Sequence, residues 1–502
     1  MSTSMSTSMS HIELSHEQKY AFDKFRSGNN LFITGPGGTG KTKLIDTFVE
    51  YMNFRGIKHQ VCAMTGCATV LLNKCKARTL HSWSGIKLAK GASDRVVYSV
   101  LKNKFAAKEW RSIKVLIVDE VSMMSKKIFD ILNQIGKSIK KNQTPFGGIQ
   151  VIFTGDFYQL PPVGNMNEHE TMQFCFESED WYHVFPLQNH IELKTMFRQK
   201  DTDYIKVLSQ IRTGEIDEHS IQLLRQYVKR DFNSDSGLRP TKLFAVRSKT
   251  DFVNQSMYSK LEEPEYSFNM EIKTDCTTFI DNGKAIPIED LEICSKLTSE
   301  EIKFEIDQLM NTRNVTSSLS LKKGTIVMCN VNIDMENSIC NGSQGVIVDF
   351  EFGNKIPVVL FSNGIRKRIE VEYFQSADYP SICIGQIPLS LAWALTIHKI
   401  QGASLSIADM DLGNSIFEYG QTYVALSRVK SLEGLYLSAF NPNRIRANPI
   451  VKMFYSNIPD ISERSGCESV EKMEDKNKNS EISCAELSIE DYVDPNIKRI
   501  YL

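Results

Sequence analysis

Short runs of apolar residues, each followed by glycine or polar positions, recur through the first third of the chain. Three of them are residues 31–34, 113–120 and 149–154. Runs of this length between turn signals are typical of strands that are buried on both faces of a parallel sheet. The apolar positions of 43–49 recur with helical spacing and predict a helix with one apolar face. Together these segments predict an α/β fold.

The same pattern divides the rest of the chain. A strand at 242–246 begins a second α/β block, which continues through 388–402 and 419–428. Short strands within 321–375 alternate with glycine and asparagine turns and predict a small barrel. Residues 255–320 are charged and mixed, and we expect a helical or irregular insertion there. We expect disorder in the Met, Ser and Thr repeat at 1–10 and beyond about 460, with 487–501 as a candidate docking segment.

The composition is that of a globular protein. Of the 502 residues, 41% are hydrophobic and 24% are charged, which is ordinary for a soluble chain of about three or four domains. The net charge is −1, but residues 461–502 contribute −4 to it, so the remainder carries +3. This balance neither supports nor excludes a nucleic-acid ligand, because a binding groove needs only local positive charge.

The cysteine pattern favours an intracellular protein. The eleven cysteines include no C-x-x-C pair, which indicates reduced thiols and argues against zinc or a disulfide framework. Cys62, Cys67 and Cys75 form one close group, interpreted as small apolar residues, with metal binding as the alternative. No apolar run reaches the roughly 18 residues of a membrane span, and the N-terminus resembles neither a secretory signal nor a transit peptide. The nucleus, the mitochondrion and a cytoplasmic viral replication site all stay open.

Residues 35–42 read GPGGTGKT and match the phosphate-loop pattern G-x-x-x-x-G-K-[ST]. The strand before them and the helix after them provide the context that the pattern requires. Backbone N–H groups and the helix N-terminus attract phosphate, the lysine reaches the β and γ phosphates, and the hydroxyl binds magnesium. The alternative is an unrelated glycine-rich turn. The candidate ATP-binding residues are Gly35, Gly37, Gly38, Thr39, Gly40, Lys41 and Thr42, and Thr42 is also a candidate magnesium ligand.

A glutamine upstream of the loop has two interpretations. Ser15 and Gln18 match a capping-box pattern at the start of a helix. The Gln18 amide can also pair with both edges of adenine, which would favour ATP. Capping is the favoured role, and adenine binding is the alternative.

Acidic residues and a second glutamine follow the later apolar runs. Asp119 and Glu120 end the strand at 113–120. Asp119 is a candidate magnesium ligand, and Glu120 is a candidate for polarising the attacking water. Gln159 follows the strand at 149–154, where its amide is suited to sense the γ-phosphate. The carboxyl ends of these strands should meet at one crevice, where open α/β sheets bind ligands.

Other polar segments permit two interpretations each. Residues 60–69 and 78–85 are small, polar and turn-rich, which suits contacts to a sugar-phosphate chain and suits ordinary loops equally well. Arg198 lies between an aromatic residue and an amide. An arginine there is either a salt-bridge residue or a finger onto the transferring phosphate. Arg428 lies near the end of a predicted helix whose face includes Tyr423 and Leu426.

The motifs described above, taken in their order along the chain, resemble those of a superfamily 1 helicase of the Pif and RecD branch. The resemblance is more specifically to the Pif family and covers about residues 14–440. The matching segments are 35–42, 119–123, 155–163, 197–199, 393–402 and 423–428. Two positions depart from the family pattern. Residues 67–69 are Cys-Ala-Thr where paired alanines are usual, and Ile400 stands where a serine is usual.

The resemblance implies an ATP- and magnesium-dependent motor that moves 5′ to 3′ on single-stranded DNA and unwinds tailed or forked duplexes. It would act as a monomer in replication, repair or recombination. The fold would contain two RecA-like parallel-sheet core domains, the first at 14–192 with a wedge insertion near 84–108. The second would be split into 193–262 and 386–458, with an insertion at 263–385 that contains a Src-homology-like barrel. Residues 1–13 and 459–502 would be disordered.

The resemblance also implies roles for particular residues. Arg198 and Arg428 would reach the γ-phosphate from the second core domain, and Trp83 is a candidate for stacking on bases. The candidate catalytic residues are then Lys41, Glu120, Gln159, Arg198 and Arg428. The candidate DNA contacts are Thr65, His81, Thr396, His398 and Lys399.

Two other functions share the phosphate loop. A nucleic-acid-stimulated ATPase that remodels protein–DNA or RNA complexes without strand separation would use the same ATPase residues, and it is the alternative to the helicase. A nucleotide-dependent switch or kinase would have no use for a second α/β block that ends in Arg428. We therefore favour the helicase.

Overall fold

The structure is a computed structural model. It describes residues 14–460 except 66, 67, 70, 71, 88, 233–239, 281, 282, 314, 332, 335, 336, 338, 340, 341, 352, 354, 355, 377, 378, 403, 404 and 406. The expectations of disorder at 1–13 and 461–502, the candidate docking segment at 487–501 and the position of Cys67 lie outside the described residues. Within the described part of the chain, no helix is both long and apolar enough to cross a membrane.

The first α/β block is built on a six-stranded sheet with the order β3-β2-β4-β5-β1-β6, and each neighbouring pair is parallel. Its central strands are buried because they are continuous apolar runs, and residues 115–118 of β4 are at most 3% exposed. The strands are β1 (Leu31–Thr34), β2 (His59–Ala63), β3 (Arg78–Thr79), β4 (Val115–Asp119), β5 (Gln150–Thr154) and β6 (His190–Glu192).

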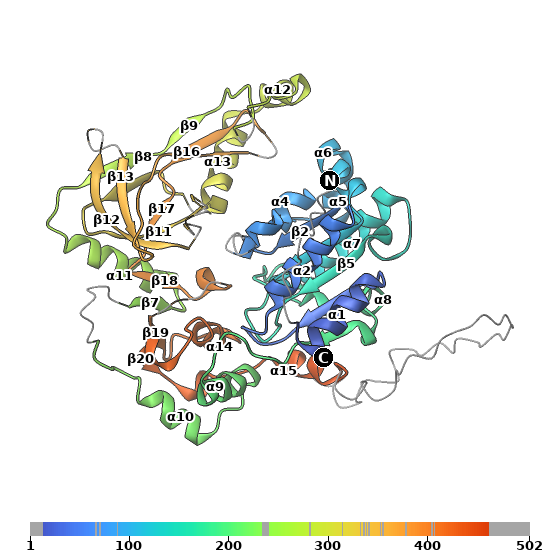
Figure 1. Cartoon of the computed structure of the whole chain (residues 1–502). Coiled ribbons are helices and arrows are strands. Elements are labelled where there is room, and N and C mark those ends of the chain that lie inside the picture. The colour runs from blue at the N-terminus through green and yellow to red at the C-terminus, as the bar shows by residue number, and fades with distance from the viewer. Residues whose placement is uncertain are drawn as a thin grey trace, which may run out of the picture. The chain divides into compact units, whose positions relative to one another are not determined.

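Helices surround this sheet (Figure 1). The capping box predicted at Ser15 and Gln18 is formed at the start of α1, and the Ser125 side chain caps α7. The α5 and α6 helices occupy the segment where a wedge insertion was expected. The helices are α1 (His16–Arg26), α2 (Lys41–Phe54), α4 (Leu80–Ser84), α5 (Ser93–Lys102), α6 (Lys104–Ser112), α7 (Lys126–Lys140) and α8 (Trp181–Val184).

Trp83 is a core residue, and its expected role in stacking on bases is wrong. Its side chain is 1% exposed, and its ring centroid lies 4.7 Å from that of Trp110. The Trp110 indole N–H donates to the Ser84 carbonyl at 3.1 Å. An indole buried in this way has no face left for a nucleic-acid base.

The second α/β block has a four-stranded parallel sheet with the order β18-β7-β19-β20. Its strands come from the two separate segments that were expected to form it: β7 (Thr241–Phe244), β18 (Ala394–Thr396), β19 (Ala408–Leu412) and β20 (Leu435–Phe440). Its helices are α9 (Thr202–Thr213), α10 (Glu218–Arg225), α11 (Arg247–Ser259) and α14 (Gln421–Leu426). The last described helix, α15 (Pro449–Ser456), instead packs Val451 and Phe454 into the core of the first block.

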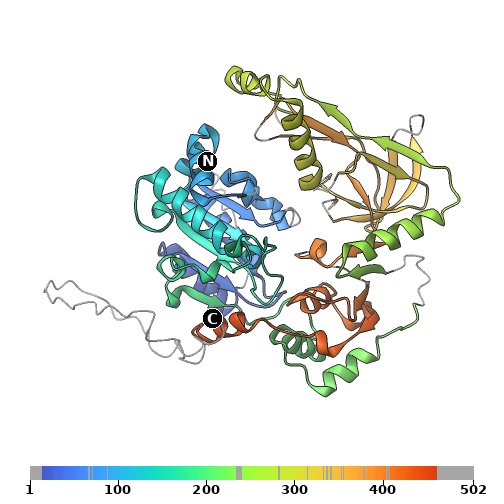
Figure 2. The ribbon, with the colours of Figure 1, turned by 180° about the vertical axis from the view of Figure 1, so that it is seen from behind.

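In both views, α11 lies between the second sheet and a group of antiparallel strands (Figures 1 and 2). Five form a sheet with the order β14-β13-β12-β11-β17, namely β11 (Ile326–Cys329), β12 (Gln344–Glu351), β13 (Ile356–Phe361), β14 (Arg366–Arg368) and β17 (Leu389–Leu391). The pair β8 (Tyr266–Asn269) and β10 (Ser318–Leu321) shares one apolar core with this sheet. The glycine and asparagine turns predicted a small barrel in this segment, and the structure has there a five-stranded and a two-stranded antiparallel sheet around one core.

Residues 255–320 are more regular than expected. Besides α12 (Ile288–Cys294) and α13 (Ser299–Arg313), they contain β8, β10 and β9 (Glu271–Lys273). A further sheet joins β9 to β16 (Cys383–Gln386) and β15 (Glu372–Gln375). The description of this segment as helical or irregular was therefore incomplete. Its strands are short and mostly exposed, and each pairs with a partner that is distant in the sequence.

Candidate active site and nucleic-acid interface

The phosphate loop connects β1 to α2, as expected. Gly38 has a φ of +99°, and a Cβ there would lie 2.7 Å from the Arg198 Cβ. Gly35 has a φ of +139°, and a Cβ there would lie 2.4 Å from the Leu193 carbonyl oxygen. Both positions therefore require glycine, because the backbone is left-handed and a second segment of the chain lies directly against the loop.

Lys41 lies inside the loop. Its ammonium donates to the Gly35 carbonyl at 2.5 Å and to the Pro36 carbonyl at 3.0 Å. Burial lowers the pKa of Lys41, and the charges of Asp156, Glu120 and Asp119 oppose that shift. Three carboxylates thus lie near enough to Lys41 to act on its charge.

Asp119 ends β4 beside the loop and is 7% exposed. Its Oδ1 accepts from the Thr154 hydroxyl at 2.5 Å and from the Glu120 N–H at 2.9 Å. Burial, together with the neighbouring charge of Glu120, raises the pKa of Asp119 to about 6, against the opposing influence of Lys41. A cation would favour the ionised form of this carboxylate, as expected for a ligand of a divalent metal ion.

Glu120 has an unusual backbone for a residue with a side chain. Its φ is 58° and its ψ is 40°, which is the left-handed region. Such a conformation costs on the order of 1 kcal/mol, and strained residues of this kind cluster at active sites. Its Oε2 accepts from the Gln401 amide at 3.1 Å. Since Gln401 follows β18 in the second block, this contact joins the two blocks.

Both arginines named by the sequence lie beside the phosphate loop. Arg198 Nη1 donates to the Ser427 carbonyl at 3.4 Å, and Arg428 Nη2 lies 3.9 Å from where a Gly37 Cβ would be. Burial, followed by the charge of Arg198, lowers the pKa of Arg428 to about 10, while Glu120 acts in the opposite direction. The site at the phosphate loop therefore brings together the guanidinium groups of Arg198 and Arg428 and the carboxylate of Glu120.

Tyr423 makes a contact to the loop that the sequence did not indicate. The Gly37 N–H donates to the Tyr423 hydroxyl at 2.9 Å. The sequence analysis assigned Tyr423 only to the face of a predicted helix. Tyr423 is buried, and it belongs both to the hydrophobic core and to the site at the phosphate loop.

Two buried glutamines have amide atoms that are available for a ligand. Gln159 is 5% exposed and Gln199 is 3% exposed. Among the residues that the structure describes, no group bonds to Gln159 Oε1 or to either amide atom of Gln199. Gln199 Oε1 lies 2.9 Å from where a Gly38 Cβ would be. Buried amides without partners are costly, so the position of Gln199 at the loop fits a site that is completed by a polar ligand such as a nucleotide with its metal ion.

Gln18 makes the capping contact that its sequence position suggested and also contacts the phosphate loop. Its Oε1 accepts from the Ser15 N–H at 3.0 Å, which confirms the capping role. Its Nε2 is directed to the loop carbonyls of Thr39 at 3.4 Å and Gly40 at 3.5 Å. Thr42 lies half-buried in the first turn of α2.

A buried ion pair lies next to this site and was missed by the sequence analysis. Arg212 of α9 binds Asp156 through two nitrogens, both at 3.0 Å. The Tyr455 hydroxyl of α15 also donates to Asp156, at 3.1 Å, and Arg212 reaches Glu192 at 3.2 Å. Asp156 lies two residues after the end of β5, so its place after a strand was visible in the sequence, but its partners lie 56 and 299 positions away.

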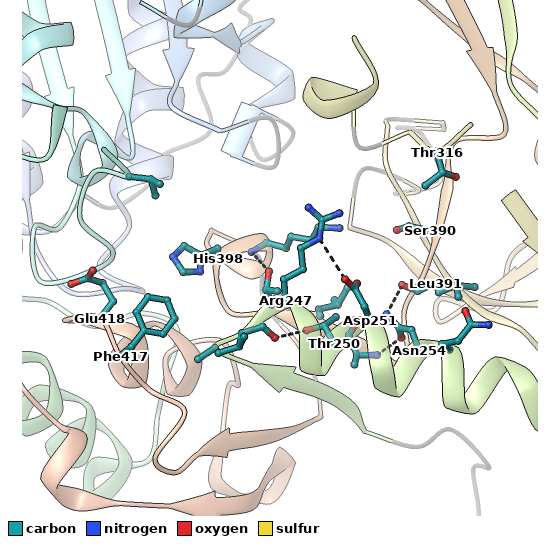
Figure 3. A pocket seen from close by; sticks show the side chains of 18 of the residues that line it. Arg247, Thr250, Asp251, Asn254, Thr316, Ser390, Leu391, His398, Phe417 and Glu418 are labelled. Carbon is teal, nitrogen blue, oxygen red and sulfur yellow. Dashed lines mark hydrogen bonds and ion pairs between the residues drawn. The ribbon is translucent and has the colours of Figure 1, made fainter. Parts of the chain in front are cut away.

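A cavity of about 1410 Å³ opens beside the second sheet (Figure 3). Three of the five candidate nucleic-acid contacts line it: Thr396 at the end of β18, and His398 and Lys399 just after it. Burial lowers the pKa of His398, against the opposing influence of Glu418. The first block contributes 161–164 to the lining, and the antiparallel strands contribute 318–320 and 389–391.

The other two candidate contacts belong to the first sheet. Thr65 follows β2, and its hydroxyl accepts from the Ala68 N–H at 3.2 Å. His81 lies in α4 directly after β3, and burial lowers its pKa. Neither is among the described residues that line the cavity, so the five candidates fall into two groups.

Comparisons with known proteins agree with this architecture. A family model described as PIF1-like helicase matches residues 13–222, and one described as DNA helicase Pif1, 2B domain, matches 308–350. The chain is 33% identical over 451 residues to ATP-dependent DNA helicase PIF1 of Xenopus laevis, which covers 88% of this chain and 64% of that protein. It is 32% identical over 482 residues to ATP-dependent DNA helicase RRM3 of Saccharomyces cerevisiae, which covers 86% and 66%.

A solved structure matches more completely. The crystal structure of Pif1 helicase from Candida albicans is 31% identical with a TM-score of 0.72, and the match covers 89% of this chain and all of that one. The chain spans about two thirds of the length of the two curated relatives. The two parallel sheets therefore correspond to two RecA-like domains, each with an insertion, and the chain belongs to the PIF1-like helicase family.

Proposed function

We propose that the protein is an ATP-dependent DNA helicase that moves 5′ to 3′ on single-stranded DNA and unwinds duplex DNA in replication, repair or recombination. Its substrates would be single-stranded DNA and tailed or forked duplexes, on which it would act as a monomer. The names of the two curated relatives support the activity, and the polarity rests on the family resemblance.

One observation carries the proposal. Arg198 and Arg428, which come from outside the first sheet, lie against the phosphate loop of that sheet and near Glu120. A nucleotide bound there would be contacted by both blocks at once, so its hydrolysis would change the contacts between them. This is the requirement for converting ATP turnover into a domain motion.

The residues at the loop have the chemistry for phosphoryl transfer to water. Lys41 would bind the β and γ phosphates, Glu120 would orient the attacking water, and Gln159 would contact the γ-phosphate. Arg198 and Arg428 would stabilise charge that develops on the phosphate oxygens. Magnesium, when bound with ATP, would neutralise phosphate charge, and Thr42 and Asp119 are the residues suited to hold it. Gln18 would contact adenine in addition to capping α1.

The cavity beside the second sheet is the proposed path of the single strand. Thr396, His398 and Lys399 line it, and Lys399 is exposed. We propose Thr65 and His81 as further strand contacts on the first sheet. The strand would then touch both expected core domains, 14–192 on one side and 193–262 with 386–458 on the other, with 263–385 as the insertion. Within 386–458, α15 packs into the core of the first block. Intracellular function in a reducing compartment is part of the same proposal.

ATP turnover and strand separation test the proposal together. Purified protein should hydrolyse ATP faster with single-stranded DNA and should separate a 5′-tailed duplex but not a 3′-tailed one, in the presence of magnesium. Lys41→Ala should abolish both activities, because the loop loses its phosphate-binding ammonium. Lys43→Ala is the matched control, because Lys43 is an exposed lysine on the same helix, and it should retain both.

The possible results separate the alternatives. DNA-stimulated turnover without strand separation on any tailed duplex would favour a remodelling ATPase. Equal stimulation by RNA would remove the preference for DNA. Unwinding that survives Lys41→Ala would contradict the assignment of the loop as the site of ATP hydrolysis.

A further inference from the structure

Two cysteines are in contact in the antiparallel part of the molecule. The Sγ of Cys276 lies 3.6 Å from the Sγ of Cys383. Cys383 begins β16, where it pairs with Lys273 of β9, and Cys276 follows β9 by three residues. The Cys276 N–H donates to the Ser381 carbonyl at 3.1 Å. The backbone on both sides of the pair therefore holds the two thiols next to each other.

The two thiols differ in their access to solvent. Cys276 is half-buried, whereas Cys383 is 0% exposed. Burial, together with the neighbouring Cys276, raises the pKa of Cys383 to about 12. A reagent in solution therefore meets Cys276 first, while Cys383 stays protonated behind it.

We propose that Cys276 and Cys383 form a modification site for hydroperoxides, which convert the pair into an intramolecular disulfide. The inference concerns residues that take no part in the proposed ATP site, so it does not depend on the helicase proposal. It also differs from the sequence expectation, which treated the cysteines as reduced thiols and gave Cys276 and Cys383 no common role.

The reaction has two steps. In the first, the thiolate sulfur of Cys276 attacks a peroxide oxygen, so that an S–O bond forms and the O–O bond breaks. The leaving oxygen takes a proton and departs as water or an alcohol. In the second, the sulfur of Cys383 attacks the sulfenic sulfur of Cys276, so that the S–S bond forms and the S–O bond breaks. The hydroxide leaves as water with the proton of Cys383, and the two thiols together have given two electrons to the peroxide.

The geometry requires only a small movement for this second step. The two sulfur atoms would have to approach from 3.6 Å to about 2 Å, the length of a disulfide bond. Cys175 is a useful contrast, because it is also fully buried but its thiol donates to the Val121 carbonyl at 3.7 Å. A buried thiol with a carbonyl as its neighbour has no sulfur in position to complete the second step.

Peptide mapping after peroxide treatment tests the proposal directly. The full chain is treated with hydrogen peroxide, its remaining thiols are alkylated, and the digest is analysed by mass spectrometry without reductant. We expect a cross-linked peptide pair joining Cys276 to Cys383, lighter by two hydrogen atoms than the reduced pair and separated again by dithiothreitol. Because the cross-link closes the chain over 276–383, the treated protein should also migrate faster on a non-reducing gel.

Variants distinguish this pair from other thiols. Cys276→Ser and Cys383→Ala should each abolish the cross-link, while Cys294→Ser, which removes a buried thiol of α12, should leave it intact. The wild-type peptide map does not depend on whether the Cys383→Ala variant folds. Full alkylation of both cysteines after peroxide, a cross-link from Cys276 to a different cysteine, or oxidation of Cys276 to a sulfinic acid with Cys383 still free would each overturn the proposal.

Discussion

Polar side chains at the phosphate loop differ in whether other residues of the protein satisfy their hydrogen-bonding groups. Lys41, Asp119 and Glu120 all have bonds to other residues. Gln199 is buried, and neither of its amide atoms has a partner among the described residues. A polar group of this kind destabilises the free protein by roughly 1 to 3 kcal/mol. Its retention beside Gly38 is best explained by a bond that forms when a nucleotide binds.

We therefore expect Gln199→Met to separate stability from binding. The change removes a buried amide without a partner and keeps the volume, so the Tm of the free protein should not fall. The nucleotide Kd should rise about 10- to 100-fold, for the loss of one hydrogen bond to a charged group worth roughly 1.5 to 3 kcal/mol. Thermal unfolding with and without ADP measures both quantities, because a ligand stabilises the folded protein by an amount that grows with the logarithm of its concentration divided by Kd.

Gln222→Met is the control for that experiment. Gln222 is an exposed residue of α10 that donates to Glu218, and its replacement should leave the ADP-induced shift unchanged. A Gln199→Met variant with a lower Tm and an unaltered ADP shift would mean that Gln199 has only a packing role.

Asp119 should make stability depend on pH. Its folded-state pKa of about 6 lies above its ordinary value of 3.8, so ionisation at neutral pH opposes folding and protonation favours it. Asp119→Asn should raise the stability of the nucleotide-free protein at pH 7 to 8 by about 1 to 2 kcal/mol, less than the roughly 3 kcal/mol of the full shift, because Lys41 loses a nearby negative charge.

The pH profile provides the check. The advantage of Asp119→Asn over the wild type should shrink as the pH falls from about 6 to about 4 and should vanish below that, where both folded and unfolded carboxyls are protonated. Urea unfolding at several pH values measures this difference. An advantage that grows on acidification would contradict the raised pKa.

At the scale of elements, the Asp156–Arg212 pair joins α9 to the end of β5. Both side chains are at most 9% exposed, and Arg212 also stacks over Tyr158 and Tyr455, at 4.7 Å and 5.0 Å from the ring centroids. A buried ion pair adds little net stability by itself, but removing one partner leaves an uncompensated buried charge. The junction between α9, α15 and the first sheet should therefore be sensitive to loss of the arginine.

Arg212→Met should lower the free energy of unfolding by roughly 3 to 5 kcal/mol, since Asp156 would stay buried without its cation. Urea unfolding measures this, and adding Asp156→Asn to the same chain should recover part of the loss. Arg225→Met is the matched control, because Arg225 pairs with Glu218 at 3.8 Å on the exposed face of α10. That change should cost less than about 1 kcal/mol. If Arg212→Met and Arg225→Met lowered the free energy of unfolding equally, a special role for the buried pair would be contradicted.

At the scale of the whole molecule, the cavity is lined by residues of both α/β blocks and of the antiparallel strands. Pro161 and Phe174 come from the first block, and Leu389 comes from the antiparallel strands. Arg247 and His398 come from the second block (Figure 3). A ligand that fills this cavity would contact parts of the chain that fold around separate cores.

Hydrogen exchange should detect this arrangement. Binding of a single-stranded oligonucleotide should slow amide exchange at 161–174, 245–258, 318–320 and 389–399 together, because one strand would contact all of them. The protection should weaken as salt is raised, since phosphate contacts release counterions. A blunt duplex of the same length is the control. Protection confined to one of the four segments would exclude the cavity as the path of the strand.

Much of this arrangement was predictable from local patterns. The buried runs at 31–34, 113–120 and 149–154 became β1, β4 and β5 because continuous apolar residues need cover on both faces. The phosphate loop was recognisable because its glycines and lysine are adjacent in the sequence. The strands β8 and β9 were missed, because short exposed strands have a weak pattern and acquire their structure from distant partners.

The amino-acid order alone determines the α/β class, the two blocks, the phosphate loop and the identity of the residues able to act on a nucleotide, because these depend on local periodicity and adjacent side chains. Only the tertiary structure decided that Trp83 is part of a core, that Gln199 is buried without a partner, and that Arg212 binds Asp156. It also decided that Cys276 and Cys383 are in contact. The reason is physical: burial and pairing depend on residues 27 to 107 positions away, and local periodicity carries no information about them.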